Sequence, residues 1–428
     1  KISFKVIDTA TVLDIAFFIG NALLIAKNSY VDGTYSFTVT ANSTNTDLRI
    51  YGYTTGGLGS IDNVSVKEYL GQEVVPNSGC GSWLFESQST NLITQSETFS
   101  DASWTKIATT VSSNSTTSPS GGINASTIVS TNATSEQYLD VGGLSVTSGD
   151  SYNLCCFVKK KDYDYFLIRF TGVGGAFVAS NAFFDINNGT LGTVDSGLVG
   201  SITDYGNGWY RCSVTIVASA TTVSGKVRLQ LASSDNSEAI VGDGTSGTFV
   251  WGTQFEAQSY STSYIPTEGT TKTRNQDLCT NGGDVSLINS TEGVLYAEIS
   301  ALADDLTNRV ISINDGTTNN RVSIVIGSGS NEIRGQVLSS GTSFDFSTTS
   351  YNTLNNNKIA ISYKLNDFSM WINGTKVATD TSGNTPVGMN EINFNAGGTI
   401  LSFFGKTKCL AVWKEALSDT ELTELTTI

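Results

Sequence analysis

Short runs in which apolar and polar residues alternate recur along almost the whole chain. Phe4 and Val6 alternate with Ser3 and Lys5, and the same period of two continues in Trp209–Val217. Clusters of Gly, Asn, Asp and Ser separate these runs. A period of two predicts strands with one buried face, and many short strands joined by turn residues predict sandwiches or barrels. The expected fold class is therefore all-β.

Three regions carry separate sets of such runs, which predicts three consecutive β-sandwich domains. We expect these domains in residues 1–70, 91–273 and 292–428, with linkers in 71–90 and 274–291 that are rich in turn-forming residues. The first region holds about six strands at the usual strand length. Because the chain begins in what the pattern predicts to be the middle of a strand, we expect a piece of a longer polypeptide, with the first sandwich lacking its N-terminal strands.

Local signals predict individual turns and one helix. Asn188-Gly189 and Asn373-Gly374 are expected at the tips of hairpins, where residues that tolerate positive φ are needed. Ser418 and Glu421 have the spacing of a capping box, which predicts one short C-terminal helix. The Ser- and Thr-rich stretch 112–120 is expected to be a long loop.

Composition and charge exclude several classes of function. The chain has no His, which excludes Ser-His-Asp and Cys-His nucleophile systems and His-based metal sites. Its net charge of −15 disfavours nucleic acid as a partner; solubility or a calcium-rich environment accounts for such acidity. No apolar run reaches the ~20 residues that span a bilayer, so membrane insertion is not expected.

Six cysteines are present without the spacing of a disulfide framework. Cys155 and Cys156 are adjacent and would face opposite sides of a strand. Cys80 and Cys279 flank the middle region and could lie close together. Unpaired buried thiols are the favoured interpretation, and the redox compartment stays open.

Ordered motifs in the middle region resemble a sandwich module that is common in phage tail and appendage proteins. Its most recognisable motif is Gly208-Trp209-Tyr210-Arg211. The other matching segments, in order, are 91–106, 184–190, 251–256 and 262–267, followed by an exit at 273–277. Several motifs in the right order are more specific than any one of them alone.

The flanking regions resemble related jelly rolls. The end of the first region, 60–68, is similar to the C-terminal part of a related jelly-roll module. The third region resembles a laminin-G or concanavalin-A-type jelly roll through the hairpin 371–377 and the segment 411–419. Together the resemblances imply three jelly-roll β-sandwich domains of carbohydrate-binding type on the surface of a phage virion.

Carbohydrate-binding sandwiches stack aromatic rings on sugar rings and bind hydroxyls through amide and carboxylate groups. Tyr163 and Tyr165 alternate with Asp162 and Asp164 in a predicted turn between strands, which would put both tyrosines on one side. These four residues are the candidate glycan-binding site. The alternative is a solvated hairpin with amphipathic tyrosines.

The resemblance also implies a structural calcium ion. In related sandwich modules calcium often lies where the first and last strands meet, and Glu97 and Glu256 fall on the matching motif positions. Carboxylate oxygens suit calcium. The alternative is a pair of surface or capping carboxylates, and no other cofactor is expected.

The expected function is host attachment by a phage tail or head fibre, through exposed modules that bind a host-surface polysaccharide or glycan. Other virion subunits are expected partners, and a homotrimer is expected by analogy. Enzymatic activity is not expected, because Asp304-Asp305 and the pair Asp162 and Asp164 are neighbours in sequence without a glycanase motif. The alternatives are a structural decoration or assembly module of the virion, a glycan depolymerase, and a bacterial adhesin.

Overall fold

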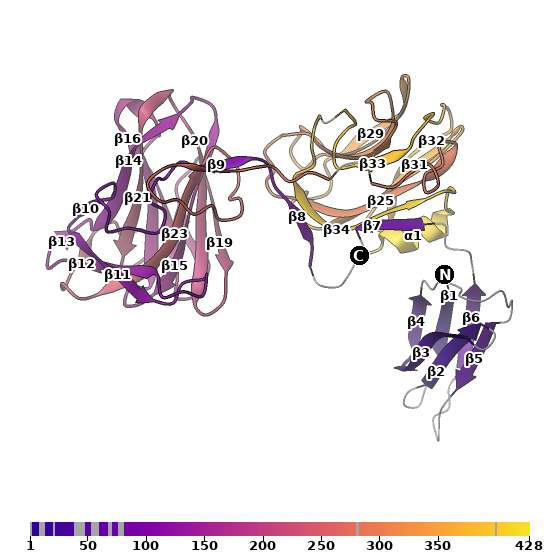
Figure 1. The fold of residues 1–428 in the computed structure, drawn as a ribbon, viewed down its shortest axis with the longest axis horizontal. Helices are drawn as coiled ribbons and strands as arrows, with labels where there is room; N and C mark the ends of the chain where they lie inside the picture. The colour runs from indigo at the N-terminus through magenta and orange to yellow at the C-terminus, as the bar shows by residue number, and fades with distance from the viewer. Residues whose placement is uncertain are drawn as a thin grey trace.

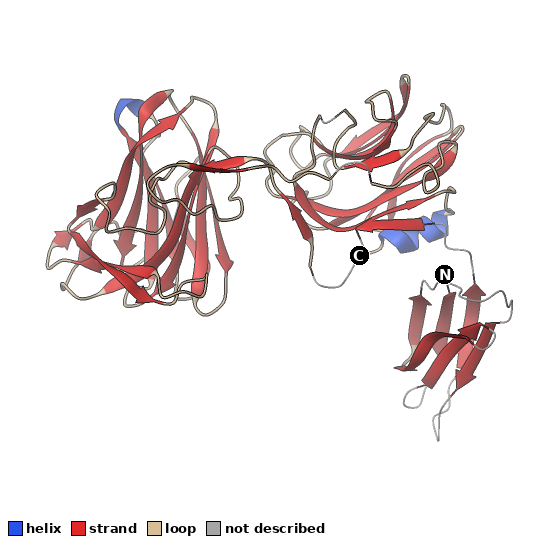
Figure 2. Ribbon diagram, in the orientation of Figure 1, coloured by secondary structure: helices blue, strands red, loops and turns tan. Residues whose placement is uncertain are grey.

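The computed structural model contains three β-sandwiches, which Figures 1 and 2 show as lobes built almost entirely of strands. The structure describes residues 2–7, 13–19, 22–37, 48–52, 60–66, 71–75, 81–279, 282–398 and 400–428. Within these ranges there are 34 strands, one α-helix and one short 3-10 turn, η1 (Val173–Gly175). The expected all-β fold class is confirmed.

The N-terminal sandwich pairs two three-stranded sheets. One sheet has the order β4 (Gly33–Phe37), β1 (Ile2–Ile7), β6 (Ser60–Val66), and the other has the order β3 (Ala22–Tyr30), β2 (Leu13–Ile19), β5 (Leu48–Gly52). Alternate residues of β1 and β2 face inward, so that Phe4, Val6, Ile15 and Phe17 form the core with Tyr30. The six strands agree with the number expected from the alternation.

The middle sandwich packs two six-stranded sheets face to face. The first sheet has the order β10 (Thr105–Ile107), β14 (Tyr138–Val146), β21 (Thr222–Ala232), β16 (Tyr165–Gly172), β17 (Ser180–Asp185), β18 (Thr190–Val194). The second has the order β11 (Thr109–Thr116), β12 (Ala125–Ser130), β23 (Gly247–Glu256), β15 (Ser151–Lys160), β20 (Trp209–Val217), β19 (Leu198–Asp204). A small ribbon, β13 (Thr134–Ser135) with β22 (Ile240–Val241), lies beside them. Leu154, Phe166 and Phe184 are among the fully buried residues between the sheets.

The C-terminal sandwich packs a seven-stranded sheet on a five-stranded sheet. The larger sheet has the order β32 (Thr375–Asp380), β31 (Asp367–Ile372), β30 (Asn357–Lys364), β25 (Glu292–Ala301), β34 (Gly405–Trp413), β7 (Gly71–Val75), and β8 (Trp83–Phe85) also pairs with β34. The smaller sheet has the order β29 (Thr342–Thr348), β28 (Ile333–Ser339), β27 (Asn320–Ile326), β26 (Arg309–Asn314), β33 (Glu391–Asn393). Their shared core includes Leu295, Ile324 and Ile361.

Both segments that were expected as linkers contribute to the C-terminal sandwich, so the linker prediction is wrong there. β7 pairs with β34 along 410–413, and β8 pairs with it along 405–407. Phe85 enters the core and stacks on Phe394 with the ring centroids 4.3 Å apart. From the second segment, Ile288 enters the same core and Gly282 exchanges backbone hydrogen bonds with Ile392. Strands as short as β8 show no clear period, and their partner lies near the other end of the chain.

The middle sandwich is consequently an insertion between β8 and β25 of the C-terminal sandwich. The chain enters it through β9 (Ser89–Asn91) and leaves it through β24 (Lys272–Arg274), and these two strands pair with each other. An inserted domain needs its two ends close together, and this pairing supplies that closeness. Figure 1 shows the two crossings side by side between the lobes. We call residues 85–91 and 272–279 the neck.

One buried carboxylate organises the neck. The backbone N–H of Glu86 donates to Asp277 Oδ2 at 2.9 Å, and the N–H of Asp277 donates to the Glu86 carbonyl at 2.9 Å. The Glu86 side chain accepts from the N–H of Ser263 at 2.7 Å and lies 3.3 Å from the Arg274 guanidinium. Glu86 is only 3% exposed. A buried carboxylate needs such partners, so Glu86 holds both crossings in one register.

The predicted turns and helix are confirmed. Asn188-Gly189 joins β17 to β18, and a side chain at Gly189 (φ +70°) would collide with the Tyr210 ring. Asn373 and Gly374, both with positive φ, join β31 to β32. The helix α1 (Asp419–Thr426) begins with the expected capping box. No described segment forms a helix long and apolar enough to cross a bilayer. The loop expected at 112–120 is wrong in part, because β11 extends to Thr116 as an exposed edge strand.

In the part of the chain that the structure describes, Cys155, Cys156, Cys212 and Cys279 form no disulfide, in agreement with the favoured interpretation of the cysteines. Cys156 and Cys212 lie opposite each other on β15 and β20 and face the core, whereas Cys155 faces outward. Burial raises the pKa of Cys156 to about 12, so its thiol is neutral. Cys279 is partly buried and unpaired, and Cys80, which was expected near it, lies outside the described residues.

The insertion predicts how the C-terminal sandwich tolerates truncation. A chain in which residues 86–277 are replaced by a short Gly-Ser linker keeps β7 and β8 on β34, and we expect it to unfold cooperatively. A fragment that starts at residue 292 leaves that edge of β34 unpaired, and we expect its melting temperature to be lower by about 5 °C or more. Circular dichroism during heating checks this. Equal melting temperatures would show that β7 and β8 are dispensable.

Candidate functional site

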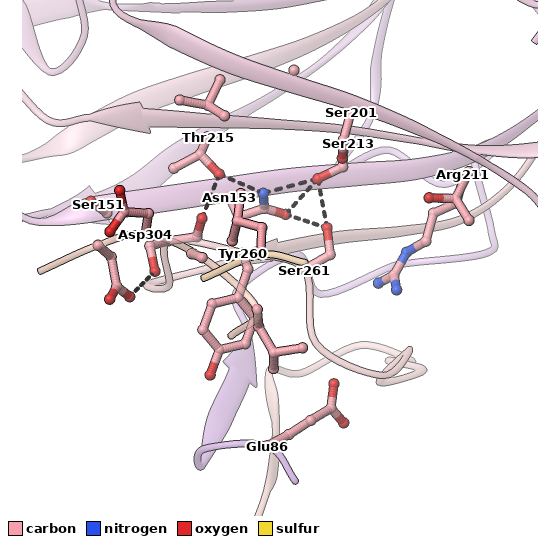
Figure 3. Close-up of a pocket in the computed structure, with 18 of the residues that line it drawn as sticks. Glu86, Ser151, Asn153, Ser201, Arg211, Ser213, Thr215, Tyr260, Ser261 and Asp304 are labelled. Atoms are coloured by element: carbon pink, nitrogen blue, oxygen red, sulfur yellow. Dashed lines mark hydrogen bonds between the residues drawn. The ribbon is translucent and has the colours of Figure 1, made fainter. Parts of the chain in front are cut away.

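A cavity of about 800 Å³ lies between the middle and C-terminal sandwiches (Figure 3). Its first wall is the outer face of β15, β19 and β20, and the segment 259–263 lies against that face. Its second wall comes from the C-terminal sandwich, through the turn 302–305, Leu354 and Lys406, with Leu84 and Glu86 at the neck. Ligand sites occupy roughly 300–1,000 Å³, so the cavity has the size of a binding site for a small oligosaccharide or peptide.

The floor of the cavity is a closed hydrogen-bond network on the sheet. The Asn153 amide donates to the hydroxyls of Ser213 (2.9 Å) and Thr215 (2.8 Å), and its carbonyl accepts from Ser261 (2.6 Å). The hydroxyls of Ser213 and Ser261 are 2.6 Å apart, and Thr215 donates to the Ser259 carbonyl at 3.0 Å. Dashed lines in Figure 3 mark these bonds. The network fastens the segment 259–263 to the sheet and leaves these groups with little capacity for a ligand.

Hydroxyls beside that network are available. Ser151, Ser201 and Thr203 line the cavity, and their side chains form no hydrogen bond with any residue that the structure describes. They lie on alternate positions of β15 and β19, where one face of the strands looks into the cavity. These three hydroxyls can donate to and accept from the hydroxyls of a bound molecule.

Tyr205 presents an aromatic ring at the end of the same wall. It follows β19, lines the cavity and is 48% exposed. Its ring meets Phe157 edge to face, with the centroids 4.8 Å apart, which fixes the ring orientation. Tyr260 also lines the cavity, but it is buried, its hydroxyl bonds to Ser87 at 3.0 Å, and burial raises the pKa of its phenol. Tyr205 is therefore the ring that can stack on a ligand.

Arg211, on β20, also lines the cavity. Its Nη2 donates to the Thr262 carbonyl at 2.6 Å and lies 3.1 Å from the Cys155 sulfur, and the guanidinium lies 5.4 Å from the centre of the Phe157 ring. Figure 3 shows the guanidinium directed away from the sheet, into the open space. Burial raises the pKa of Cys155, so that thiol is neutral and supplies no counter-charge.

The two aspartates of the opposite wall are held by donors. Asp305 pairs with Arg309 at 2.6 Å and accepts from Ser259 of the middle sandwich. Burial alone would raise the pKa of Asp305, but hydrogen bonds from Arg309 and Ser259 and the Arg309 charge hold it below the ordinary value. Asp304 accepts from Ser330 (2.6 Å) and from the N–H of Asn331 (3.0 Å). Asp305 is thus ionised and also bonds the two sandwiches together.

The predicted glycan-binding residues lie elsewhere and do not form one face. Tyr163 packs partly buried against the interior core, whereas Tyr165 packs on the outer face with Leu167. The expectation that both rings share one side is therefore wrong, because Tyr163 precedes β16 in a turn that breaks the period of two. Asp162 pairs with Lys161 and accepts from the N–H of Gly247 at 2.9 Å, and Asp164 pairs with Lys160 at 2.5 Å. A binding role for these four residues stays a prediction.

The two predicted calcium ligands have separate surroundings. Glu256 is fully buried and accepts from Ser89 (2.5 Å) and from the Thr262 hydroxyl and N–H. Glu97 accepts from Asn124 (3.0 Å) and from the Tyr264 hydroxyl (3.1 Å). Among the residues that the structure describes, no three acidic or cysteine side chains cluster as a metal site would. Protein donors occupy both carboxylates, so this arrangement does not fit a calcium ion shared between them.

The cavity residues were missed by sequence reasoning for a clear reason. Tyr205 and Arg211 flank Trp209, which is buried and whose indole N–H donates to the Thr117 carbonyl at 3.1 Å. The sequence around them therefore indicates packing and not a ligand site. Arg211 is the last residue of the recognised motif, which was the one available signal. The second wall belongs to a different sandwich, and no local pattern indicates that the two walls meet.

Comparisons with known proteins find likeness in fold only. No protein-family model matches the sequence, and no curated protein is similar to it. Among solved structures, the CBM40 of the Ruminococcus gnavus IT-sialidase bound to α2,3-sialyllactose is 16% identical, with a TM-score of 0.30 over 34% of this chain and 93% of that one. Domains LG4-5 of the mouse laminin α1 chain are 10% identical, with a TM-score of 0.23 over 67% of this chain and 90% of that one. Such values say nothing about which ligand this chain binds.

The lowered pKa of Asp305 predicts that acid weakens the contact between the middle and C-terminal sandwiches. Because its pKa is lowered in the folded chain, its contribution is present above the unfolded value near 4 and is lost as the pH falls through the lowered value. We expect Asp305→Asn to cost roughly 1–3 kcal/mol at pH 7, since it breaks a partly buried ion pair. Thermal unfolding of wild type and variant from pH 7 to pH 3 should show the difference shrinking. Exposed Asp367→Asn is the control, and a difference that stays constant with pH would contradict the assignment.

Proposed function

We propose that this chain binds glycans, and that the cavity between the middle and C-terminal sandwiches is the site. The observation that carries the proposal is one cavity of about 800 Å³ whose wall presents the half-exposed Tyr205 ring at one end and, along β15 and β19, the unpartnered hydroxyls of Ser151, Ser201 and Thr203. An aromatic face and a few polar groups in a mostly preformed cavity suit a sugar, which has apolar C–H faces and an equatorial rim of hydroxyls.

An aliphatic rim supports the same conclusion. Val199, Val217, Leu84 and Leu354 border the cavity, and their exposed fractions are 70%, 52%, 43% and 50%. They come from both sandwiches. Large exposed aliphatic side chains gathered around one polar cavity favour a ligand that covers them, and the C–H faces of a glycan do so without burying unsatisfied hydroxyls.

We propose that this binding serves attachment to a host surface from a phage virion. The support is the ordered set of appendage motifs in the middle region, of which Gly208-Trp209-Tyr210-Arg211 is the most specific. Repeated copies on a fibre, a homotrimer among them, would add avidity to weak single sites. The proposed location is the virion surface, beside other virion subunits.

We propose binding without cleavage. A glycosidase needs one carboxyl group that stays protonated to act as an acid. The pKa of Asp305 is instead lowered, and Arg309 neutralises its charge. This favours a lectin-like site over the depolymerase alternative.

A glycan-array screen of the purified chain tests the proposal. We expect selective binding that Tyr205→Ala weakens by about tenfold or more, because stacking and its buried area are lost. Tyr51→Ala is the matched control, since Tyr51 is 45% exposed on the N-terminal sandwich, and it should bind like wild type. A chelator arm tests the expected calcium at Glu97 and Glu256, and an assay for new reducing ends tests the depolymerase alternative.

Two results would overturn this assignment. A blank array from a folded sample would favour the structural-decoration alternative. Loss of binding in Tyr163→Ala or Tyr165→Ala, with Tyr205→Ala unaffected, would move the site to the turn before β16.

A further inference from the structure

Some of the charged side chains that line the cavity form a direct ion pair, and others do not. Glu86 pairs with Arg274, Asp305 pairs with Arg309, and Asp304 accepts two hydrogen bonds. Arg211, by contrast, has no carboxylate oxygen within 4 Å among the residues that the structure describes, although it lines the cavity. The fully buried carboxylate of Glu256, more than 4 Å away, is a counter-charge that acts on Arg211 through space. The guanidinium therefore has a distant counter-charge but no direct ion pair, which leaves it able to bind an anionic group in the cavity.

The donors of Arg211 show where a partner would bind. Nη2 is used by the Thr262 carbonyl and the Cys155 sulfur. Nη1 has no acceptor among the described residues, and Nε is buried without one. Because Arg211 lines the cavity and Figure 3 shows its guanidinium directed away from the sheet, we infer that Nη1 can donate to a molecule bound there.

A second cation borders the same space. Lys406, at the start of β34, lines the cavity from the C-terminal sandwich, is exposed and forms no ion pair with a described residue. The two described lining cations without an ion pair, Arg211 and Lys406, thus come from opposite walls, whereas Asp304, which also has no ion pair, accepts hydrogen bonds from Ser330 and Asn331. At physiological ionic strength the Debye length is about 8 Å, so acidic residues far from the cavity have little effect on an anion that binds there.

We propose that Arg211 anchors an acidic group of the glycan, and that the ligand class is a glycan with carboxylate-bearing sugars, such as uronic or nonulosonic acids. This inference rests on the proposed function and adds the charge of the ligand. A carboxylate against a guanidinium forms short, charge-assisted hydrogen bonds. It would satisfy Nη1, while Tyr205 and the hydroxyls of β15 and β19 bind the neutral part of the sugar. Lys406 would close over the anion from the other side.

The experiment compares acidic polysaccharides with the same polymers after chemical reduction of their carboxyl groups to alcohols, which removes charge and leaves the sugar ring. The probes are polygalacturonate, alginate, hyaluronan and polysialic acid, with dextran sulfate to distinguish sulfate from carboxylate recognition. We expect wild type to bind at least one acidic probe about tenfold or more tightly than its reduced form. Arg211→Gln should keep only the preference of about two- to threefold that Lys406 supplies.

Further variants separate recognition from folding. Arg211 also bonds to the Thr262 carbonyl, so Arg211→Gln is checked by thermal unfolding and by its binding to the reduced probe. Lys406→Gln changes an exposed side chain and should reduce binding of the acidic probe by about two- to threefold. Exposed Lys272→Gln is its matched control and should have no effect.

Each outcome decides the matter. Equal wild-type binding to acidic and reduced probes would overturn the role of Arg211 and leave the glycan-binding proposal standing. A discrimination of about tenfold that survives in a folded Arg211→Gln variant would overturn it as well. A preference for dextran sulfate alone would replace the carboxylate by a sulfate ester. Absence of binding to every probe and to the glycan array would overturn both proposals.

Discussion

The arrangement of the two larger sandwiches depends on the burial of one charged group, the carboxylate of Glu86. The carboxylate is held by the Arg274 guanidinium and by the N–H of Ser263, which belong to the second crossing and to the segment that lies over the sheet. The Glu86 backbone exchanges hydrogen bonds with Asp277, so the same residue also joins the two crossings. A carboxylate in this position is stable only when its cation and its donor are in place. The neck is therefore a single hydrogen-bonded unit, and it fixes how the two larger sandwiches lie relative to each other.

The cavity forms because the neck places the middle and C-terminal sandwiches in this arrangement. Its polar wall is the outer face of the sheet that contains β15 and β20, and this face has two parts. At one end Phe157, Trp209 and Trp251 form a buried aromatic cluster. At the other end the Asn153 network and the free hydroxyls face the C-terminal sandwich. Asp305 reaches across to Ser259 and sets how closely the second wall approaches. The site therefore belongs to the pair of sandwiches and not to either one.

Much of the fold follows from local sequence, because local rules determine it. Alternation identified strands such as β20, and the Asn-Gly pairs and the capping box identified turns and a helix whose geometry depends on a few adjacent residues. The rules failed where the deciding partner is distant. Thr109–Thr116 is a strand because β12 lies beside it, although its own Ser and Thr residues suit a loop equally well. β7 and β8 are short and flank a stretch of turn-forming residues, and their pairing with β34 is what makes them strands. The prediction of the site from sequence missed the cavity for the same reason. Tyr163 and Tyr165 are close in sequence and form a local pattern, whereas the insertion of the middle sandwich brings Tyr205 and Arg211 to the same cavity as Lys406.

The insertion also decides how the molecule carries mechanical load. Tension applied between the N-terminal sandwich and the C-terminal helix enters the C-terminal sandwich at β7 and passes into β34 through backbone hydrogen bonds within one sheet. The middle sandwich hangs from that sheet by its two paired crossings and lies outside the direct path. A pull along the chain would thus strain the C-terminal sheet first, while the fold of the middle sandwich stays unstretched.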